Sequence, residues 1–205
     1  RVNVLGTQNI LDSAKKVGAT MIFISSNAVY NGKEPFYDEN KQTNPIDMYG
    51  KTKEKGESLV KESGVNFTIL RLMTMYGWPP ENARSNPAKW IIQELRGGNK
   101  INVVNDILNN HLWAGQASSA IWKVINKDLK GKVYNIAGRD CVSRFDFALK
   151  TAKIFGLNSS LINSVPNSFF KDIAPRPKNT CFETSLMENE LGIRPIGVEE
   201  GLRLM

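Results

Sequence analysis

Short apolar runs alternate along this chain with longer segments of helical spacing, and that alternation most constrains the fold. Four apolar runs are predicted to be strands, at residues 21–24, 65–72, 101–104 and 133–136. Helices are predicted at residues 4–17, 47–63, 87–96, 114–125, 144–155 and 198–204. Strands separated by helices of this length form right-handed parallel crossovers. The pattern therefore predicts an α/β fold whose parallel sheet carries helices on both faces.

The composition excludes several classes of protein. The chain has 205 residues, of which 41% are hydrophobic and 23% charged, as in a soluble globular protein. No apolar run approaches the ~20 residues that span a bilayer, and the first residues lack the order of a signal peptide. We therefore expect a cytoplasmic protein without membrane contact. The formal charge is +7, but the lysines are scattered among glutamates and do not alternate with aromatic residues, so nucleic-acid binding is not expected.

Cysteine and histidine are scarce. Cys141 and Cys181 are the two cysteines, and they lack Cys-x-x-Cys spacing, so we predict neither a disulfide framework nor a thiolate zinc site. Both are expected to be small buried hydrophobic side chains. The single histidine, His111, excludes an imidazole-rich metal site, and we predict no metal. Beside Leu112 and Trp113, His111 is expected to be a packed or surface residue, with a substrate-side donor as the alternative.

Tyr49 and Lys53 are spaced i and i+4 on a predicted helix, so their side chains lie on one face. A nearby lysine cation favours the phenolate, which makes a phenol a better proton donor or acceptor at neutral pH. The spacing alone is weak evidence. Tyr37 and Lys41 share it within a loop rich in turn residues, and an exposed helix pair is the alternative interpretation of Tyr49 and Lys53.

Ser26 ends the first predicted strand. Ligands of open parallel sheets bind beyond the carboxyl ends of the strands, which is where this hydroxyl would lie. The alternative is a hydroxyl that only satisfies a local backbone group. Together, Ser26, Tyr49 and Lys53 form a hypothetical proton-transfer set in which the serine binds a carbonyl or hydroxyl and the tyrosine exchanges its proton.

Three segments carry a resemblance to a known family. Residues 23–30 (Phe-Ile-Ser-Ser-Asn-Ala-Val-Tyr) and 49–53 (Tyr-Gly-Lys-Thr-Lys) resemble the Ser-x-x-x-Val-Tyr and Tyr-x-x-x-Lys signatures of extended short-chain dehydrogenases. Residues 3–11 (Asn-Val-Leu-Gly-Thr-Gln-Asn-Ile-Leu) are similar to the helix that precedes the catalytic strand in that family. The resemblance implies a Rossmann-like doubly wound parallel sheet with a small substrate-binding subdomain.

The same resemblance implies the site and its ligands. Ser26, Tyr49 and Lys53 would be catalytic, and the cofactor would be NADP or NAD. The partner would be a nucleotide-diphosphate sugar, and the family leaves room for a homodimer. Cofactor contacts are expected at Tyr49, Lys53, Ser25 and Met73, and substrate contacts at Asn27, Asn86 and Arg176.

Later segments resemble one branch, the dTDP-4-dehydrorhamnose reductases. These segments are residues 101–110, 143–148 and 176–179. The branch implies that hydride passes to C4 of a keto sugar while the tyrosine protonates the new alkoxide. Two departures lie toward the sugar: His111-Leu112 stand where the branch usually has Pro-Thr, and Thr74 where it has tryptophan. A nucleotide-sugar 4-epimerase and a non-catalytic regulatory or binding subunit of the same fold stay open as alternatives, whereas a dehydratase is disfavoured because Asn27 and Ala28 cannot ionise.

The glycine-rich turn of a dinucleotide-binding fold is not among these residues. We therefore expect residues 1–100 to be the C-terminal part of a Rossmann domain whose first strands are missing, and residues 101–205 to be mostly a substrate-binding subdomain with a returning sheet segment. Roughly 80 to 100 residues would precede the chain in the intact protein. The fragment alone is expected to be inactive and to bind the dinucleotide weakly.

Overall fold

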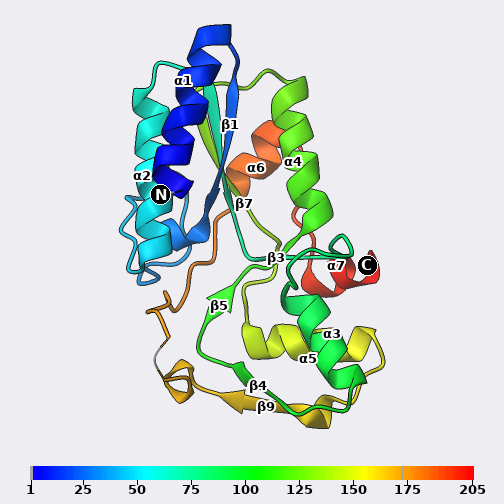
Figure 1. The fold of residues 1–205 in the computed structure, drawn as a ribbon. Helices are drawn as coiled ribbons and strands as arrows, with labels where there is room; N and C mark the ends of the chain where they lie inside the picture. Colours follow the sequence, from blue (N-terminus) through cyan, green and yellow to red (C-terminus); the bar gives the residue numbers. More distant parts are fainter. Residues whose placement is uncertain (1, 172) are drawn as a thin grey trace.

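A three-stranded parallel sheet forms the upper part of the computed structural model, which describes residues 2–171 and 173–205 (Figure 1). The strands are β1 (Met21–Ser26), β2 (Phe67–Leu72) and β7 (Lys132–Ile136), in the order β1-β2-β7. They are in register through Ile24, Leu70 and Tyr134. All three strands run parallel, so their carboxyl ends lie at the same edge of the sheet.

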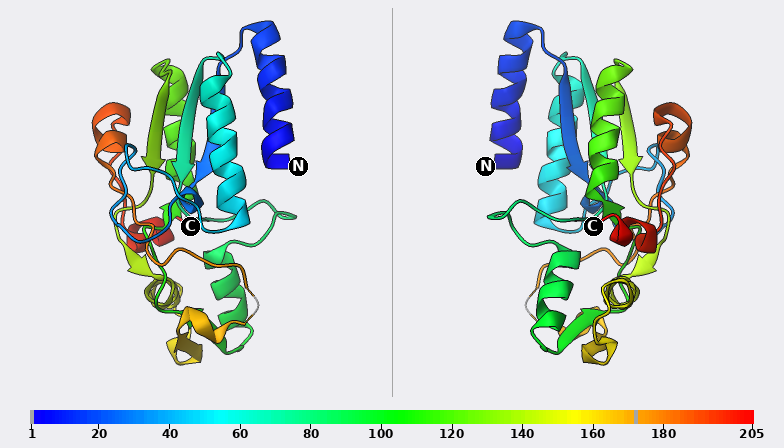
Figure 2. Two further views of the ribbon diagram at one scale, coloured as in Figure 1. Left: turned by 90° about the vertical axis from the view of Figure 1, so that its left-hand side faces the viewer. Right: turned by 90° about the vertical axis from the view of Figure 1, so that its right-hand side faces the viewer.

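Helices cover both faces of this sheet (Figures 1 and 2). One face carries α1 (Thr7–Val17), which follows the π-helical turn η1 (Val2–Gly6), and α2 (Met48–Glu62). The other face carries α4 (Ala114–Asn126) and α6 (Ser185–Leu191). Adjacent residues of β2 divide between the two layers, since Ile69 packs with α1 and α2 while Leu70 packs with α4 and α6. The predicted doubly wound α/β class is confirmed.

A second core lies below the carboxyl edge of the sheet (Figure 1). It contains α3 (Pro87–Arg96), α5 (Arg144–Ile154), α7 (Val198–Arg203), β4 (Ile101–Val104) and β9 (Ile162–Val165), the last two paired in parallel. Ile91 and Leu95 of α3 pack in one cluster with Ile101 of β4 and Phe147 of α5. The packing therefore places α3 in the lower core, whereas the boundary expected at residue 100 would put this helix with the sheet.

Short elements join the two cores. β3 (Met75–Tyr76) pairs with β6 (Leu112–Trp113), and β5 (Leu108–Asn109) pairs with β8 (Val142–Ser143). The described residues also form the 3₁₀ turns η2 (Asn27–Val29), η3 (Ser159–Leu161) and η4 (Asn167–Phe169). Within the described ranges, no helix has the length and apolar character needed to cross a membrane.

The cysteine prediction is wrong, because Cys141 and Cys181 form a disulfide. Their Cα atoms lie 5.8 Å apart although 40 positions separate them in the sequence. Cys141 directly precedes β8. Cys181 lies in a later segment that pairs with β5 through the isolated β-bridge between Leu108 and Asn179. The fold brings the pair together, and cysteine spacing carries no sign of that approach.

Candidate active site

A cavity of about 320 Å³ opens beyond the carboxyl ends of β1 and β2, where ligands of open parallel sheets bind. We call it the first cavity. It brings together most residues that the sequence singled out for catalysis, cofactor or substrate. They are Ser25, Ser26, Asn27, Tyr49, Lys53, Met73 and Arg176.

The start of α2 places Tyr49 at this cavity. Asp47 caps the helix by accepting a hydrogen bond from the Gly50 amide at 2.6 Å. At Gly50 a β-carbon would collide with the carbonyl oxygen of Ala28, so only glycine lets the helix start this close to the residues that follow β1. Tyr49 keeps 51% of its surface exposed, which leaves its phenol open to a ligand.

Lys53 lies one helical turn after Tyr49, and its ammonium group reaches the end of β1. Its Nζ donates to the Ile24 carbonyl oxygen at 2.9 Å and lies 5.2 Å from the centre of the Phe23 ring. Partial burial lowers the pKa of the ammonium group. An ammonium carries three donors, so the bond to Ile24 leaves two for other groups in the cavity.

The adjacent serines at the end of β1 form hydrogen bonds with different partners. Ser26 is 9% exposed, and its hydroxyl accepts from the Ala28 amide at 3.2 Å and donates to the Asn27 Oδ1 atom at 3.3 Å. The Ser25 hydroxyl instead donates to the Glu57 carboxylate at 2.6 Å. Ser25 lines the cavity, but its hydroxyl proton is already used, so a cofactor contact there would use its main chain or the hydroxyl oxygen as an acceptor.

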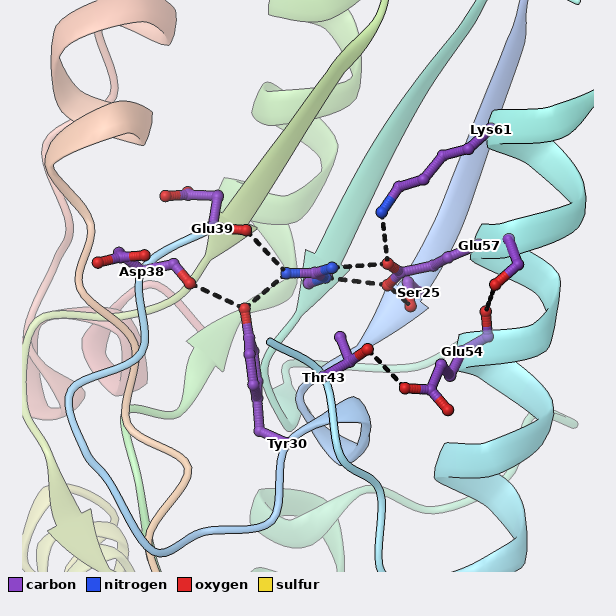
Figure 3. A network of polar contacts seen from close by, with 10 residues as sticks. Ser25, Tyr30, Asp38, Glu39, Thr43, Glu54, Glu57 and Lys61 are labelled. Atoms are coloured by element: carbon purple, nitrogen blue, oxygen red, sulfur yellow. Dashed lines mark hydrogen bonds and ion pairs between the residues drawn. The ribbon is translucent and has the colours of Figure 1, made fainter. Parts of the chain in front are cut away.

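Behind the serines lies a buried polar network (Figure 3). The Glu57 carboxylate accepts two hydrogen bonds from the Arg71 guanidinium, at 2.9 and 2.7 Å. Arg71 also donates to the Tyr30 hydroxyl at 2.6 Å. Burial alone would raise the pKa of the Glu57 carboxyl, but Arg71 and the hydroxyl of Ser25 hold it below its ordinary value. The network joins α2, β1 and β2, and its member Ser25 lines the first cavity.

The far wall of the first cavity comes from distant parts of the chain. Asn27 donates to the Thr180 hydroxyl at 2.7 Å, and Asn109 donates to the same oxygen at 2.9 Å. Met73 is 2% exposed and contributes its side chain beside Asn109. Thr180 and Asn109 line the cavity as well, and neither was predicted as a site residue.

A second cavity of about 460 Å³ lies between α3, β4 and α5, and we call it the second cavity. Asn86 lines it, but its side chain caps α3 through the Lys89 amide at 3.2 Å and donates to the Gly77 carbonyl at 2.7 Å. His111 is buried in its wall and stacks on Phe147, with ring centres 4.2 Å apart. The prediction of a packed histidine therefore holds, although the ring also faces a cavity.

Arg176 and Arg144 each line both cavities. The resemblance predicted Arg176 as a substrate contact, whereas Arg144 lies in a segment that resembles the family but was not predicted as a site residue. Thr74 is the third residue shared by the two cavities. A basic residue at the start of a helix is usually predicted to be exposed to solvent, so only the fold reveals that Arg144 faces a cavity.

The donors of the two cavities fit a dinucleotide cofactor and a phosphorylated substrate. The first cavity offers an ammonium, a phenol, a hydroxyl and amide groups, which match the amide and ribose of a nicotinamide nucleotide. Two guanidinium groups at the junction match phosphate oxygens.

Comparison with known proteins identifies the family. The family model described as "RmlD substrate binding domain" matches residues 1–205. The chain belongs to this family. It is 25% identical to a dTDP-4-dehydrorhamnose reductase of Aggregatibacter actinomycetemcomitans over 98% of this chain and 71% of that protein. It is also 28% identical to the methionine adenosyltransferase 2 subunit beta of Bos taurus, covering 98% of this chain and 63% of that protein.

Solved structures of the family agree with the fold. A dTDP-4-dehydrorhamnose reductase of Bacillus anthracis in complex with NADP has a TM-score of 0.89 and 29% identity, over 98% of this chain and 70% of that one. A reductase of the same name from Yersinia enterocolitica has a TM-score of 0.85 at 29% identity, over the same shares of the two chains. The expectation of a nicotinamide dinucleotide agrees with the NADP bound to the Bacillus relative.

Proposed function

We propose that this chain forms the catalytic and substrate-binding part of an enzyme that uses NADPH or NADH to reduce a 4-keto nucleotide sugar. One observation carries the proposal. Ser26 from the end of β1 and Tyr49 and Lys53 from α2 line the same cavity. The chain spans 71% of the first reductase relative and 61% of a probable low-salt glycan biosynthesis reductase of Haloferax volcanii, so the activity belongs to the whole protein.

The proposed chemistry is reduction of a carbonyl to an alcohol. The bound dinucleotide supplies the hydride that the carbonyl carbon accepts. Tyr49 gives its phenolic proton to the carbonyl oxygen, which becomes the new hydroxyl. Ser26 turns its single O–H from the Asn27 Oδ1 atom to donate a hydrogen bond to the same oxygen. Lys53, held by the Ile24 carbonyl at 2.9 Å, brings a positive charge into the same cavity.

The proposed cofactor contacts are Tyr49, Lys53, Met73 and Ser25. All four residues line the first cavity, at the carboxyl edge of the parallel sheet. NADP in the Bacillus relative supports the choice of cofactor class. Which dinucleotide the intact enzyme prefers would be read from its rates with NADPH and NADH.

The proposed substrate extends across both cavities. Its sugar would occupy the first cavity beside Asn27, and its nucleoside the second, where Trp90 and Phe170 offer aromatic surface. Arg176 borders both cavities and would meet the phosphates. Asn86 would act mainly by fixing the start of α3, because its side chain already holds that helix.

The proposal is tested with the intact protein, NADPH and a dTDP-4-keto-6-deoxy sugar. We expect stoichiometric loss of NADPH absorbance, and a fall in kcat of about 10²-fold or more in Tyr49→Phe. Tyr37→Phe is the matched control, because Tyr37 has the same spacing from Lys41 but lies outside both cavities. Full activity in Tyr49→Phe would remove Tyr49 from the mechanism.

Two other functions would give different results. An epimerase would interconvert nucleotide sugars with no net change in cofactor absorbance. A regulatory subunit, suggested by the likeness to methionine adenosyltransferase 2 subunit beta, would turn over no sugar and would bind an adenosyltransferase. The site favours the reductase, since a purely binding role does not require a serine, a tyrosine and a lysine around one cavity.

A further inference from the structure

The side chain of Thr180 is linked to the proposed catalytic serine, Ser26, through Asn27. The Thr180 hydroxyl oxygen accepts hydrogen bonds from the Asn27 Nδ2 atom at 2.7 Å and from the Asn109 Nδ2 atom at 2.9 Å. A hydroxyl oxygen has two lone pairs, so the two amides occupy both of them. Thr180 is fully buried, and it lines the first cavity together with Ser26, Asn27 and Asn109.

The orientation of the Asn27 amide decides which of its atoms faces Ser26. Because the Nδ2 atom of Asn27 donates to Thr180, the Oδ1 atom is the end that accepts from the Ser26 hydroxyl, at 3.3 Å. The Ser26 oxygen also accepts from the Ala28 amide at 3.2 Å, so neighbouring groups fix this hydroxyl both as donor and as acceptor. A hydroxyl donor bond of 3.3 Å is long, so the carbonyl oxygen of a ligand competes well with Asn27 for the serine proton.

The main chain around Thr180 is held from two sides. Its amide donates to the Leu108 carbonyl at 3.3 Å, and the Leu108 amide donates to the Lys178 carbonyl at 2.7 Å. The next residue, Cys181, forms the disulfide with Cys141. These bonds hold the Thr180 hydroxyl at a fixed point in the wall of the first cavity, which is what a group that orients another side chain requires.

We propose that Thr180 is a positioning residue for the reduction: it fixes the amide of Asn27, and the amide sets the direction of the Ser26 hydroxyl proton. The inference rests on the proposed function and extends it. Without the Thr180 hydroxyl, the amide nitrogen of Asn27 would face an apolar wall, which is unfavourable for an N–H donor. The amide would turn away, and Ser26 would point at the substrate carbonyl in only a fraction of the complexes.

The test measures kcat of the intact protein with NADPH and the dTDP-4-keto-6-deoxy sugar. Thr180→Val keeps the shape of the side chain and removes the acceptor, so we expect kcat to fall about 10-fold. In Ser26→Ala the same substitution should change kcat less than about 2-fold, because the hydroxyl that Thr180 orients is gone. Thr180→Ser keeps the hydroxyl and should have a kcat within about 2-fold of the wild type.

Thr68→Val is the matched control. Thr68 is a fully buried threonine of β2 whose hydroxyl donates to the Leu129 carbonyl, outside both cavities, so its loss should leave kcat unchanged. Thr180→Val leaves two buried amide donors without an acceptor, which lowers stability. If that variant does not fold, Asn109→Ala/Thr180→Val removes one of the two donors, and its kcat should be about 10-fold below that of Asn109→Ala.

Nuclear magnetic resonance measures the contact without turnover. The side-chain amide signal of Asn27, assigned by its loss in Asn27→Asp, should exchange its protons with water faster in Thr180→Val than in the wild type and Thr180→Ser. Unchanged exchange in Thr180→Val would overturn the inference. So would an equal fall in kcat with and without the Ser26 hydroxyl, since Thr180 would then be structural support only. A wild type that oxidised no NADPH would instead refute the proposed function, and the inference with it.

Discussion

The carboxylate of Glu57 accepts two parallel hydrogen bonds from the Arg71 guanidinium, Nε to Oε1 at 2.9 Å and Nη2 to Oε2 at 2.7 Å (Figure 3). This pair joins α2 to β2, and Ser25 of β1 adds a third bond at 2.6 Å. Tyr49, Lys53 and Glu57 follow one another at intervals of four residues, so they share a helix face. The ion pair therefore fixes the helix that carries Tyr49 and Lys53 against the strand that ends at the candidate active site.

Removing one partner of this ion pair should be costly. In Glu57→Gln the buried charge of Arg71 loses its counter-charge, so we expect the free energy of unfolding to fall by about 3–5 kcal/mol. Urea denaturation followed by circular dichroism measures the change. Glu62→Gln is the control, since Glu62 is exposed at the end of the same helix and should change stability by less than about 0.5 kcal/mol. Equal stability of wild type and Glu57→Gln would mean that the pair does not anchor α2.

Replacing each of the two serines at the end of β1 by alanine should affect a different property, the catalytic rate for Ser26 and the stability for Ser25. Ser26→Ala removes the hydroxyl that lines the first cavity, so kcat should fall about 10- to 1,000-fold with little loss of stability. Ser25→Ala removes a hydrogen bond to the buried carboxylate of Glu57, so the free energy of unfolding should fall by about 1.5–3 kcal/mol. Steady-state rates and urea denaturation of both variants check this. The same pattern in both variants would contradict the division of roles.

Local patterns predicted the elements that place the catalytic candidates. The apolar run at residues 21–24 and the helical spacing from Tyr49 to Lys53 each depend on neighbouring positions, and the structure has both elements. The partner of β4 was missed, because β9 has exposed Asn163 and Ser164 at its centre and is not a continuous apolar run.

Contacts between distant segments were beyond prediction for a different reason. Thr180 meets Asn27 across 153 positions, and Arg144 reaches the first cavity only because α5 packs under the sheet. No local period encodes either contact. The family resemblance supplied Arg176 as a site residue, and it included the segment of Arg144 without assigning that residue a role.

His111 should make the stability of the protein depend on pH between about 7.5 and 5, where no other side chain of ordinary pKa titrates. Burial lowers its pKa from 6.5 to about 3, so below pH 6.5 the unfolded chain binds a proton that the folded chain does not. The stabilising effect of the neutral ring is complete above pH 6.5 and is lost as the pH falls toward 3. Between pH 7.5 and 5 we expect a loss of about 2 kcal/mol.

The matched variant is His111→Gln, which keeps a polar side chain without a titrating ring. The chain has one histidine, so the variant should show a flatter dependence of unfolding free energy on pH between 7.5 and 5. Urea denaturation at four pH values measures both slopes. Parallel curves for the two proteins would show that His111 is not held neutral in the folded state.

The Cys141–Cys181 disulfide should stabilise the fold and hold the wall that carries Thr180. It closes a loop of 40 positions, and by loop entropy its reduction should cost about 4 kcal/mol and lower the Tm on the order of 10 °C. Cys181 directly follows Thr180, whose hydroxyl accepts from Asn27 at 2.7 Å, so reduction should also weaken ligand binding in the first cavity.

Melting curves with and without a dithiol measure the effect on stability. The double variant Cys141→Ser/Cys181→Ser should melt at the temperature of the wild type with its disulfide reduced. Its melting temperature should not change with the dithiol, because it has no bond to break. If the wild type melted at the same temperature in both conditions, the bond would contribute nothing to stability.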